Sequence, residues 1–175
     1  AEFDWRSDAS VEAALRRLRH DEHLDLALRG GVISRSIVIA HSTENVIKES
    51  LNPRIRVAAD TTWPELNCLL NHPEEFRPRA SRVFESDFLA ERFAEAEFHP
   101  EDTPGFLFDL DLDYLLTRKA LAPTDGTWLR HLLNSAALVT ASREEEWLRL
   151  LRLDAELTPE FLLHQLRLRI AEADA

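Results

Sequence analysis

The sequence has little of what marks secreted, membrane-bound or nucleic-acid-binding proteins. A single cysteine, Cys68, in 175 residues excludes an internal disulfide framework. No apolar run is long enough to span a bilayer or to form a signal peptide, so we expect a cytoplasmic protein. Positive charge is also scarce, because 21 Lys and Arg stand against 32 Asp and Glu and leave a formal net charge of −11. That balance argues against nucleic acid and anionic membranes as partners.

The composition that remains is typical of one folded unit. Hydrophobic residues make up 45% of the chain and charged residues 30%, and the sequence has neither an internal repeat nor a low-complexity segment. Because this length and apolar content are enough to build a core, we predict a single domain over residues 1–175. The surplus of Asp and Glu suits a cationic substrate or a bound divalent metal ion.

Helical and strand patterns alternate along the chain. Ser7 or Ser10 can cap a first helix that ends near Arg19, and a second helix ends at the pair Gly30–Gly31. A β-branched run then predicts a strand with His41 at its carboxyl end. Strands are expected over 37–40, 54–60, 106–112 and 137–142, and further helices over 86–98, 127–136, 142–153 and 159–173. This alternation predicts an α/β fold with a mainly parallel sheet flanked by helices, whose ligands gather at the carboxyl ends of the strands.

The segment GFLFDLDLDYLL, residues 105–116, carries three aspartates at alternate positions of an apolar run. If residues 106–112 are extended, Asp109, Asp111 and Asp113 share one face of the strand. A strand with one open face would leave them in water. A strand covered on both faces would need Arg or Lys partners, protonation or a metal ion, because a buried unpaired carboxylate is strongly unfavourable. Since no Lys or Arg lies within the strand, we predict a divalent cation over Asp109 and Asp111.

Two other segments contain similar ligands. HDEHLD, residues 20–25, and AHSTEN, residues 40–45, hold imidazole and carboxylate groups. Carboxylates combined with imidazole select Mn²⁺, Fe²⁺ or Zn²⁺ by geometry and availability. The string Asp21, His23 and Asp25 also fits a solvated helix face, because positions i and i+2 of a helix do not point the same way. The residue types alone therefore leave both a metal site and a surface helix open.

The order of these segments resembles that of the arginase-like metallohydrolases. DEHLDLALRGGVISRSIVIAHSTEN and FLFDLDLDYLL are similar to an early histidine turn, a strand ending in D-x-H-x-D and a later strand carrying D-x-D. The likeness covers about Asp21 to Thr140 and points to a branch that includes peptide arginases, which convert arginine residues of a precursor peptide to ornithine. It implies the three-layer fold of arginases and deacetylases, in a reduced form, and a pair of Mn²⁺ ions.

The resemblance also implies roles for individual residues. The expected metal ligands are His23, Asp109, Asp111, His41 and Asn45. The last two stand at the outer positions of a D-x-H-x-D motif whose middle position is Thr43 here, if the strand ends align. In an alternative register, residues 21–25 form that motif instead. Asp113, Glu44 or a further residue that the resemblance does not assign is expected to carry the proton during catalysis.

The implied activity is metal-dependent hydrolysis of a guanidinium group to an amine and urea. Mn²⁺ is the expected cofactor, and the expected partner is an arginine-containing peptide or a small guanidino substrate. A homo-oligomer is compatible with the sequence. Two alternatives remain: a mononuclear metalloenzyme on the same scaffold with another reaction, and a non-catalytic binding protein with a degenerate metal site. The enzyme hypothesis predicts that residues 37–40 and 106–111 are parallel neighbours in one sheet, so that His41 and Asp111 approach at its carboxyl edge.

Overall fold

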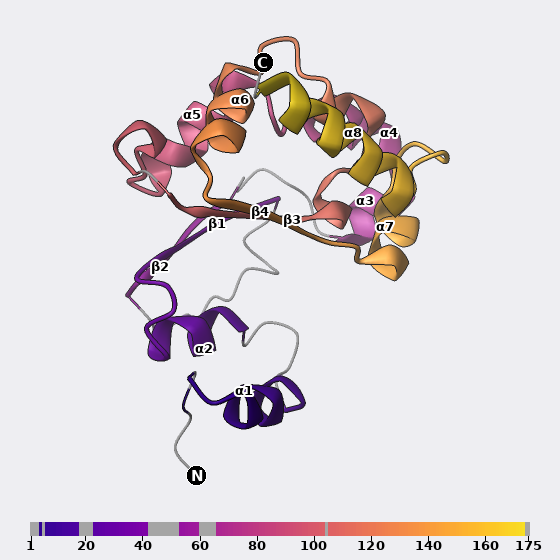
Figure 1. The fold of residues 1–175 in the computed structure, drawn as a ribbon. Helices are drawn as coiled ribbons and strands as arrows, with labels where there is room; N and C mark the ends of the chain where they lie inside the picture. Colours follow the sequence, from indigo (N-terminus) through magenta and orange to yellow (C-terminus); the bar gives the residue numbers. More distant parts are fainter. Residues whose placement is uncertain are drawn as a thin grey trace.

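A computed structural model describes residues 4, 6–17, 23–41, 53–59, 66–103 and 105–173. Helices and strands alternate through this part of the chain, which is mixed α/β as the sequence predicts (Figure 1). The strands are β1 Ser36–Ala40, β2 Ile55–Ala59, β3 Leu107–Asp111 and β4 Leu138–Ser142. The α-helices are α1 Asp8–Leu15, α2 His23–Arg29, α3 Leu66–Asn71, α4 Pro73–Ala80, α5 Ser86–Glu95, α6 Thr127–Ser135, α7 Glu145–Leu151 and α8 Pro159–Ala173. Three short 3₁₀ turns are η1 Pro100–Asp102, η2 Leu112–Tyr114 and η3 Arg118–Leu121.

Local sequence sets the ends of the first two helices. The Ser7 hydroxyl accepts a hydrogen bond from the backbone N–H of Ser10 (3.4 Å), so that Ser7 caps α1 as predicted. The helix ends at Leu15, about one turn before the predicted end. Gly31 follows α2 with φ +70°, and the N–H of Val32 donates back into the helix (2.9 Å). This closure favours glycine because a side chain is strained at that φ, and it confirms the predicted glycine stop.

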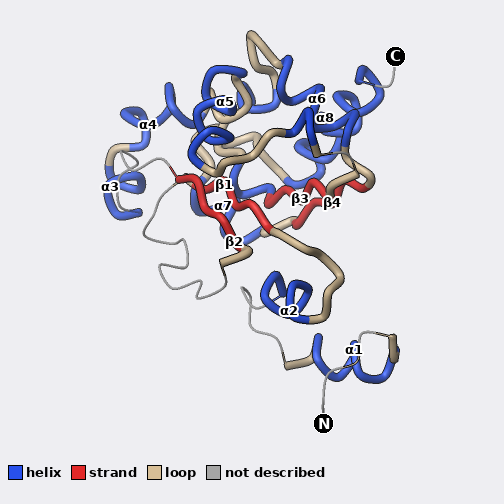
Figure 2. The backbone as a smooth tube through the Cα atoms, turned by 90° about the vertical axis from the view of Figure 1, so that its left-hand side faces the viewer, coloured by secondary structure: helices blue, strands red, loops and turns tan. Residues whose placement is uncertain are grey.

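The strands form two parallel pairs. β1 bonds to β2 with Ser36 opposite Ile55, and β3 bonds to β4 with Leu107 opposite Leu138. The predicted parallel pairing is confirmed within each pair, but the predicted pairing of β1 with β3 is wrong for the described strands, which make two separate two-stranded sheets. The two pairs nevertheless lie side by side in both views (Figure 2). Side-chain packing joins them instead of a hydrogen-bonded ladder, since Ile39 of β1 packs against the main core.

Helices cover the two sides of the strands unequally. α5, α6 and α8 lie over one side, whereas α1 and α2 lie on the other (Figure 1). α6 buries Leu129, Leu132 and Leu133, whose spacing of three and four residues places them on one helix face. From the segment before β1, the Arg35 guanidinium donates to the carbonyl oxygens of Ala96 (2.8 Å) and Glu97 (2.9 Å), just after α5. The guanidinium thus ties the segment before β1 to the C-cap of α5 and the residue that follows it.

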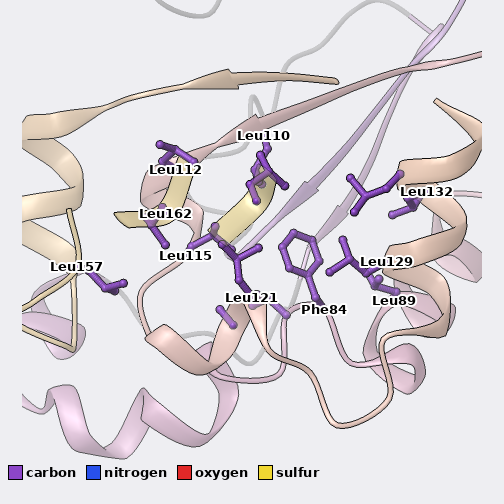
Figure 3. Close-up of a cluster of buried hydrophobic side chains, with 14 of the residues drawn as sticks. Phe84, Leu89, Leu110, Leu112, Leu115, Leu121, Leu129, Leu132, Leu157 and Leu162 are labelled. Carbon is purple, nitrogen blue, oxygen red and sulfur yellow. The ribbon is translucent and has the colours of Figure 1, made fainter. Parts of the chain in front are cut away.

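The main core lies under β3 and continues through the turn that follows it. Leu110 points into a cluster of leucines from η2, α6 and α8 (Figure 3). β3 ends at Asp111, one residue before the predicted strand end, because η2 begins at Leu112. This turn lets Leu112 and Leu115 enter the core together, each with no exposed surface. Each fully buried leucine stabilises the fold by roughly 1.5–3 kcal/mol, which favours the turn over a longer strand.

Candidate functional site

The carboxyl ends of β1 and β3 meet through His41 and Tyr114. His41 directly follows β1, and its ring stacks on the Tyr114 ring with centroids 4.2 Å apart and planes 21° apart. Its Nε2 lies 2.7 Å from the Tyr114 carbonyl oxygen. Because a carbonyl only accepts, Nε2 carries the hydrogen in this contact. The imidazole is therefore held in one orientation beside the turn that follows the aspartate strand.

Asp109 and Asp111 lie on the open face of β3. Both are exposed, whereas Leu110 between them is buried. Thr140, directly opposite on β4, donates its hydroxyl hydrogen to the Asp109 carboxylate (2.5 Å). Asp111 stands opposite Ser142. The alternation predicted for these two positions is confirmed. Of the two alternatives for this segment, the structure shows the strand with one open face: helices pack on the other face of β3, so both side chains reach water.

Asp113 leaves that face. The predicted strand would have placed it in line with Asp109 and Asp111, but it lies in η2 and is half-buried. The 3₁₀ turn breaks the period of two that would have aligned the three carboxylates. Asp113 instead directly precedes Tyr114, whose carbonyl holds His41. Its prediction as a proton carrier stays untested.

The remaining predicted ligands contribute less to the described geometry. His23 is the first residue of α2, and its side chain lies outside what the structure describes. Asp21, Thr43, Glu44 and Asn45 fall outside the described residues altogether. The described part of the site therefore consists of His41, of Asp109 and Asp111 in β3, and of Asp113 in η2.

These residues fit a metal ion in part. In favour of a metal, a histidine that ligates a metal commonly donates its other ring N–H to a backbone carbonyl, as His41 does to Tyr114. Ligating carboxylates are likewise hydrogen-bonded, as Asp109 is by Thr140. Against it, no group of three His, Cys, Asp or Glu within the described ranges is arranged to hold a metal ion. A complete shell needs at least one ligand from His23 or from residues 42–50.

The sequence did not reveal the partners Thr140 and Tyr114. Thr140 had a usable signal, because alternation in LVTAS places it on the same face as Leu138 and Ser142. Its pairing with Asp109 depends on the register of two strands that are 31 residues apart, which alternation does not set. Tyr114 accepts the hydrogen bond through its main-chain oxygen, which every residue type has. The identity of its side chain therefore could not predict this contact.

Two other carboxylates, the buried Glu85 and the half-buried Asp154, accept hydrogen bonds from backbone N–H groups. Glu85, which is 9% exposed, accepts backbone N–H groups from Thr124 (2.8 Å) and Asp125 (2.9 Å). Burial alone would raise the pKa of Glu85, but these hydrogen bonds bring it below its ordinary value. Asp154 accepts from the backbone N–H of Arg118 (2.7 Å) and from the Arg77 guanidinium. Its pKa is likewise lowered: burial opposes this shift, and the two donors cause it.

A surface hollow of about 390 Å³ lies beside Glu85. It is lined by Arg82, Glu85, Asp87, Lys119, Thr124 and Asp125. Arg82 pairs with Asp87, and Glu85 is held by the backbone as described above. Because these groups already bond to one another, the hollow offers less for ligand chemistry than the carboxyl edge of β1 and β3.

Comparisons with known proteins leave the family unassigned. No protein-family model matches the sequence, and no curated protein or solved structure matches it. Within the described residues, no helix is both long and apolar enough to cross a membrane.

Proposed function

We propose that this chain is a metal-dependent amidinohydrolase with an arginase-like three-layer fold, acting on the guanidinium group of arginine, and most simply of a peptidyl arginine. β1 and β3 lie in separate two-stranded sheets, so the direct pairing that the hypothesis predicts does not support the proposal. One other observation carries it. The contact of His41 with Tyr114 brings an imidazole from the end of β1 to the turn after the aspartate strand. Ligand sites of parallel α/β sheets lie at such carboxyl edges.

The proposed ligands are His41, Asp109, Asp111, Asn45 and His23. The three of them whose side chains the structure describes do not form a metal-binding group by themselves, so the proposal requires Asn45 and His23 to complete the shell. A bound divalent ion would lower the pKa of a coordinated water to near neutral pH and so supply the nucleophile. The reaction adds one water across a carbon–nitrogen bond and gives urea and the primary amine of ornithine. The surplus of carboxylates would attract the cationic guanidinium and hold it in a bidentate manner. Asp113, half-buried in η2, is the described group that would take up and return the proton.

Metal stoichiometry and product release test the proposal together. The protein is stripped with a chelator, reconstituted with Mn²⁺ and assayed for bound metal and for urea release from a peptide containing one internal arginine. We expect bound Mn²⁺ and urea, with both lost in Asp111→Asn. Asp102→Asn, an equal charge change on the exposed turn η1, is the matched control and should retain both. Absence of bound metal after reconstitution would exclude the hydrolase.

A second function, a binding protein that takes up cationic groups without hydrolysis, is favoured by one specific observation. The described residues hold no group of three metal ligands, and Asp109 and Asp111 are exposed to water. Such a protein would bind a guanidinium compound equally well with and without chelator and would release no urea. One metal ion per chain with no urea would indicate instead a mononuclear enzyme with another reaction.

A further inference from the structure

The outer edge of β4 is open in the part of the chain that the structure describes. β3 pairs with one side of β4, and no described strand pairs with the other. Along a strand, the N–H and C=O groups of successive residues point alternately to its two edges. The outer edge of β4 therefore presents main-chain donors and acceptors. Natural edge strands are commonly protected by charged residues or proline, but β4 reads LVTAS and contains neither. This edge is therefore chemically ready to accept another strand.

The open face beside that edge has a defined order of side chains. At its amino end, Leu107 and Leu138 stand opposite each other, and each is 53% exposed. Towards the carboxyl end follow Asp109 and Asp111 on β3, opposite the hydroxyl residues of β4. A strand added to β4 would thus meet first an apolar pair and then two carboxylates.

We propose that the outer edge of β4 binds an extended peptide by strand addition, with an apolar side chain on Leu138 and arginine or lysine side chains directed towards Asp109 and Asp111. The added strand would lie about 4.8 Å from β4 and about 10 Å from β3, a gap that a long basic side chain and an aspartate span together. Main-chain bonds supply affinity in this mode, and alternate side chains supply specificity. This inference rests on the proposed function only in taking the ligand to be a peptide with basic residues. Because Asp109 and Asp111 would not attract basic side chains while they hold a metal ion, the binding is proposed for the metal-free protein.

Charge selects this occupant over a second copy of the chain. Two copies joined along β4 would bring two chains of formal charge −11 together, each with its own exposed Asp109 and Asp111. Like charges across such a contact oppose association. A basic peptide reverses the sign of the interaction and is attracted by the same residues.

Peptide binding to the chelated protein tests the proposal separately from catalysis. The probe is RTRTLTRTR, whose alternate side chains read the same in both directions, so that parallel and antiparallel addition are both covered. Binding is measured by calorimetry or fluorescence anisotropy. We expect saturable binding of one peptide per chain, and about tenfold or greater weakening when glutamate replaces every arginine. Equal binding of the glutamate peptide would overturn the charge assignment.

Two further probes separate strand addition from simple charge attraction. One peptide is N-methylated at the four threonines, and the other is N-methylated at the arginines and the leucine. Because N–H groups of alternate residues point to the same edge of a strand, each peptide lacks the hydrogen-bond donors of one of its two edges. At least one should lose binding. If both bind like the unmodified peptide, strand addition is excluded.

On the protein, the double variant Asp109→Asn with Asp111→Asn should weaken binding by about tenfold. Glu101→Gln with Asp102→Asn, which removes the same charge from η1, should not. Equal weakening by both pairs would overturn the site. These binding assays contain no metal and are independent of the urea assay described for the proposed function. Peptide binding together with a negative urea assay would reject only the proposed function. Hydrolysis of free arginine without peptide binding would reject only this inference.

Discussion

The two faces of β3 have opposite surroundings. One face places Leu110 in the leucine core, where it is 4% exposed, and the other places Leu107 and two aspartates in water. Five consecutive residues therefore serve two purposes, one structural and one available for ligands. The comparison teaches that an apolar run can carry carboxylates at the protein surface when helices cover only one face of the strand. Variants on the two faces test how completely these two purposes are separate.

Truncation of a leucine on each face should give very different losses of stability. Leu110→Ala leaves a cavity in the core and should lower the free energy of unfolding by about 2–5 kcal/mol. Leu107→Ala removes the same atoms from a half-exposed site and should lower it by less than about 1 kcal/mol. Urea denaturation followed by circular dichroism measures both. Equal losses would mean that the open face is covered in solution.

Carboxylates should show the same contrast. Glu85→Ala removes the acceptor of two backbone N–H groups, those of the exposed residues Thr124 and Asp125, and should cost about 1–3 kcal/mol of stability. Glu101→Gln, at an exposed position of η1, is the control and should change stability by about 0.5 kcal/mol or less. A loss for Glu85→Ala no larger than that of the control would show that water replaces its hydrogen bonds.

Acid should weaken the hydrogen bonds that the carboxylates of Glu85 and Asp154 accept. The pKa values of Glu85 and Asp154 in the folded protein lie below their ordinary values of 4.5 and 3.8. Their contribution to stability is therefore fully present above those ordinary values and is lost as the pH falls through the lower folded ones. Glu85→Gln should flatten the dependence of unfolding free energy on pH below about pH 5. A slope unchanged from that of the wild type would contradict the assignment.

Neutralising the open face should have the smallest effect on stability. Asp109→Asn keeps an oxygen that can accept from Thr140, and the position is exposed, so metal-free stability should change by about 0.5 kcal/mol or less. Thermal unfolding of chelated wild type and variant measures this. A large loss would instead show that Asp109 is a structural partner of β4.

Most of the elements could be predicted from local pattern, but their pairing could not. Ser7, the glycine pair at 30–31 and the β-branched run before His41 each act on neighbouring residues, so the sequence is enough to place α1, α2 and β1. The predictions that failed concern contacts between segments that are distant in the sequence. Coverage of Asp109 depends on which sheet face the helices occupy, and the end of β3 depends on how Leu112 fits the core. Neither quantity is encoded in the residues of the strand itself.

The long reach of the His41–Tyr114 contact has a consequence for how the chain folds. It joins residues 73 apart in sequence, and the Arg35 contacts join residues 61 and 62 apart. Every fully buried member of the main core, in contrast, lies between Val83 and Leu166. Contacts between residues that are distant in the sequence have a higher entropic cost of loop closure. We therefore expect the segment after residue 66 to collapse first and β1 to pack onto it late. The candidate site would then assemble only in the last step of folding, when the imidazole reaches the finished turn.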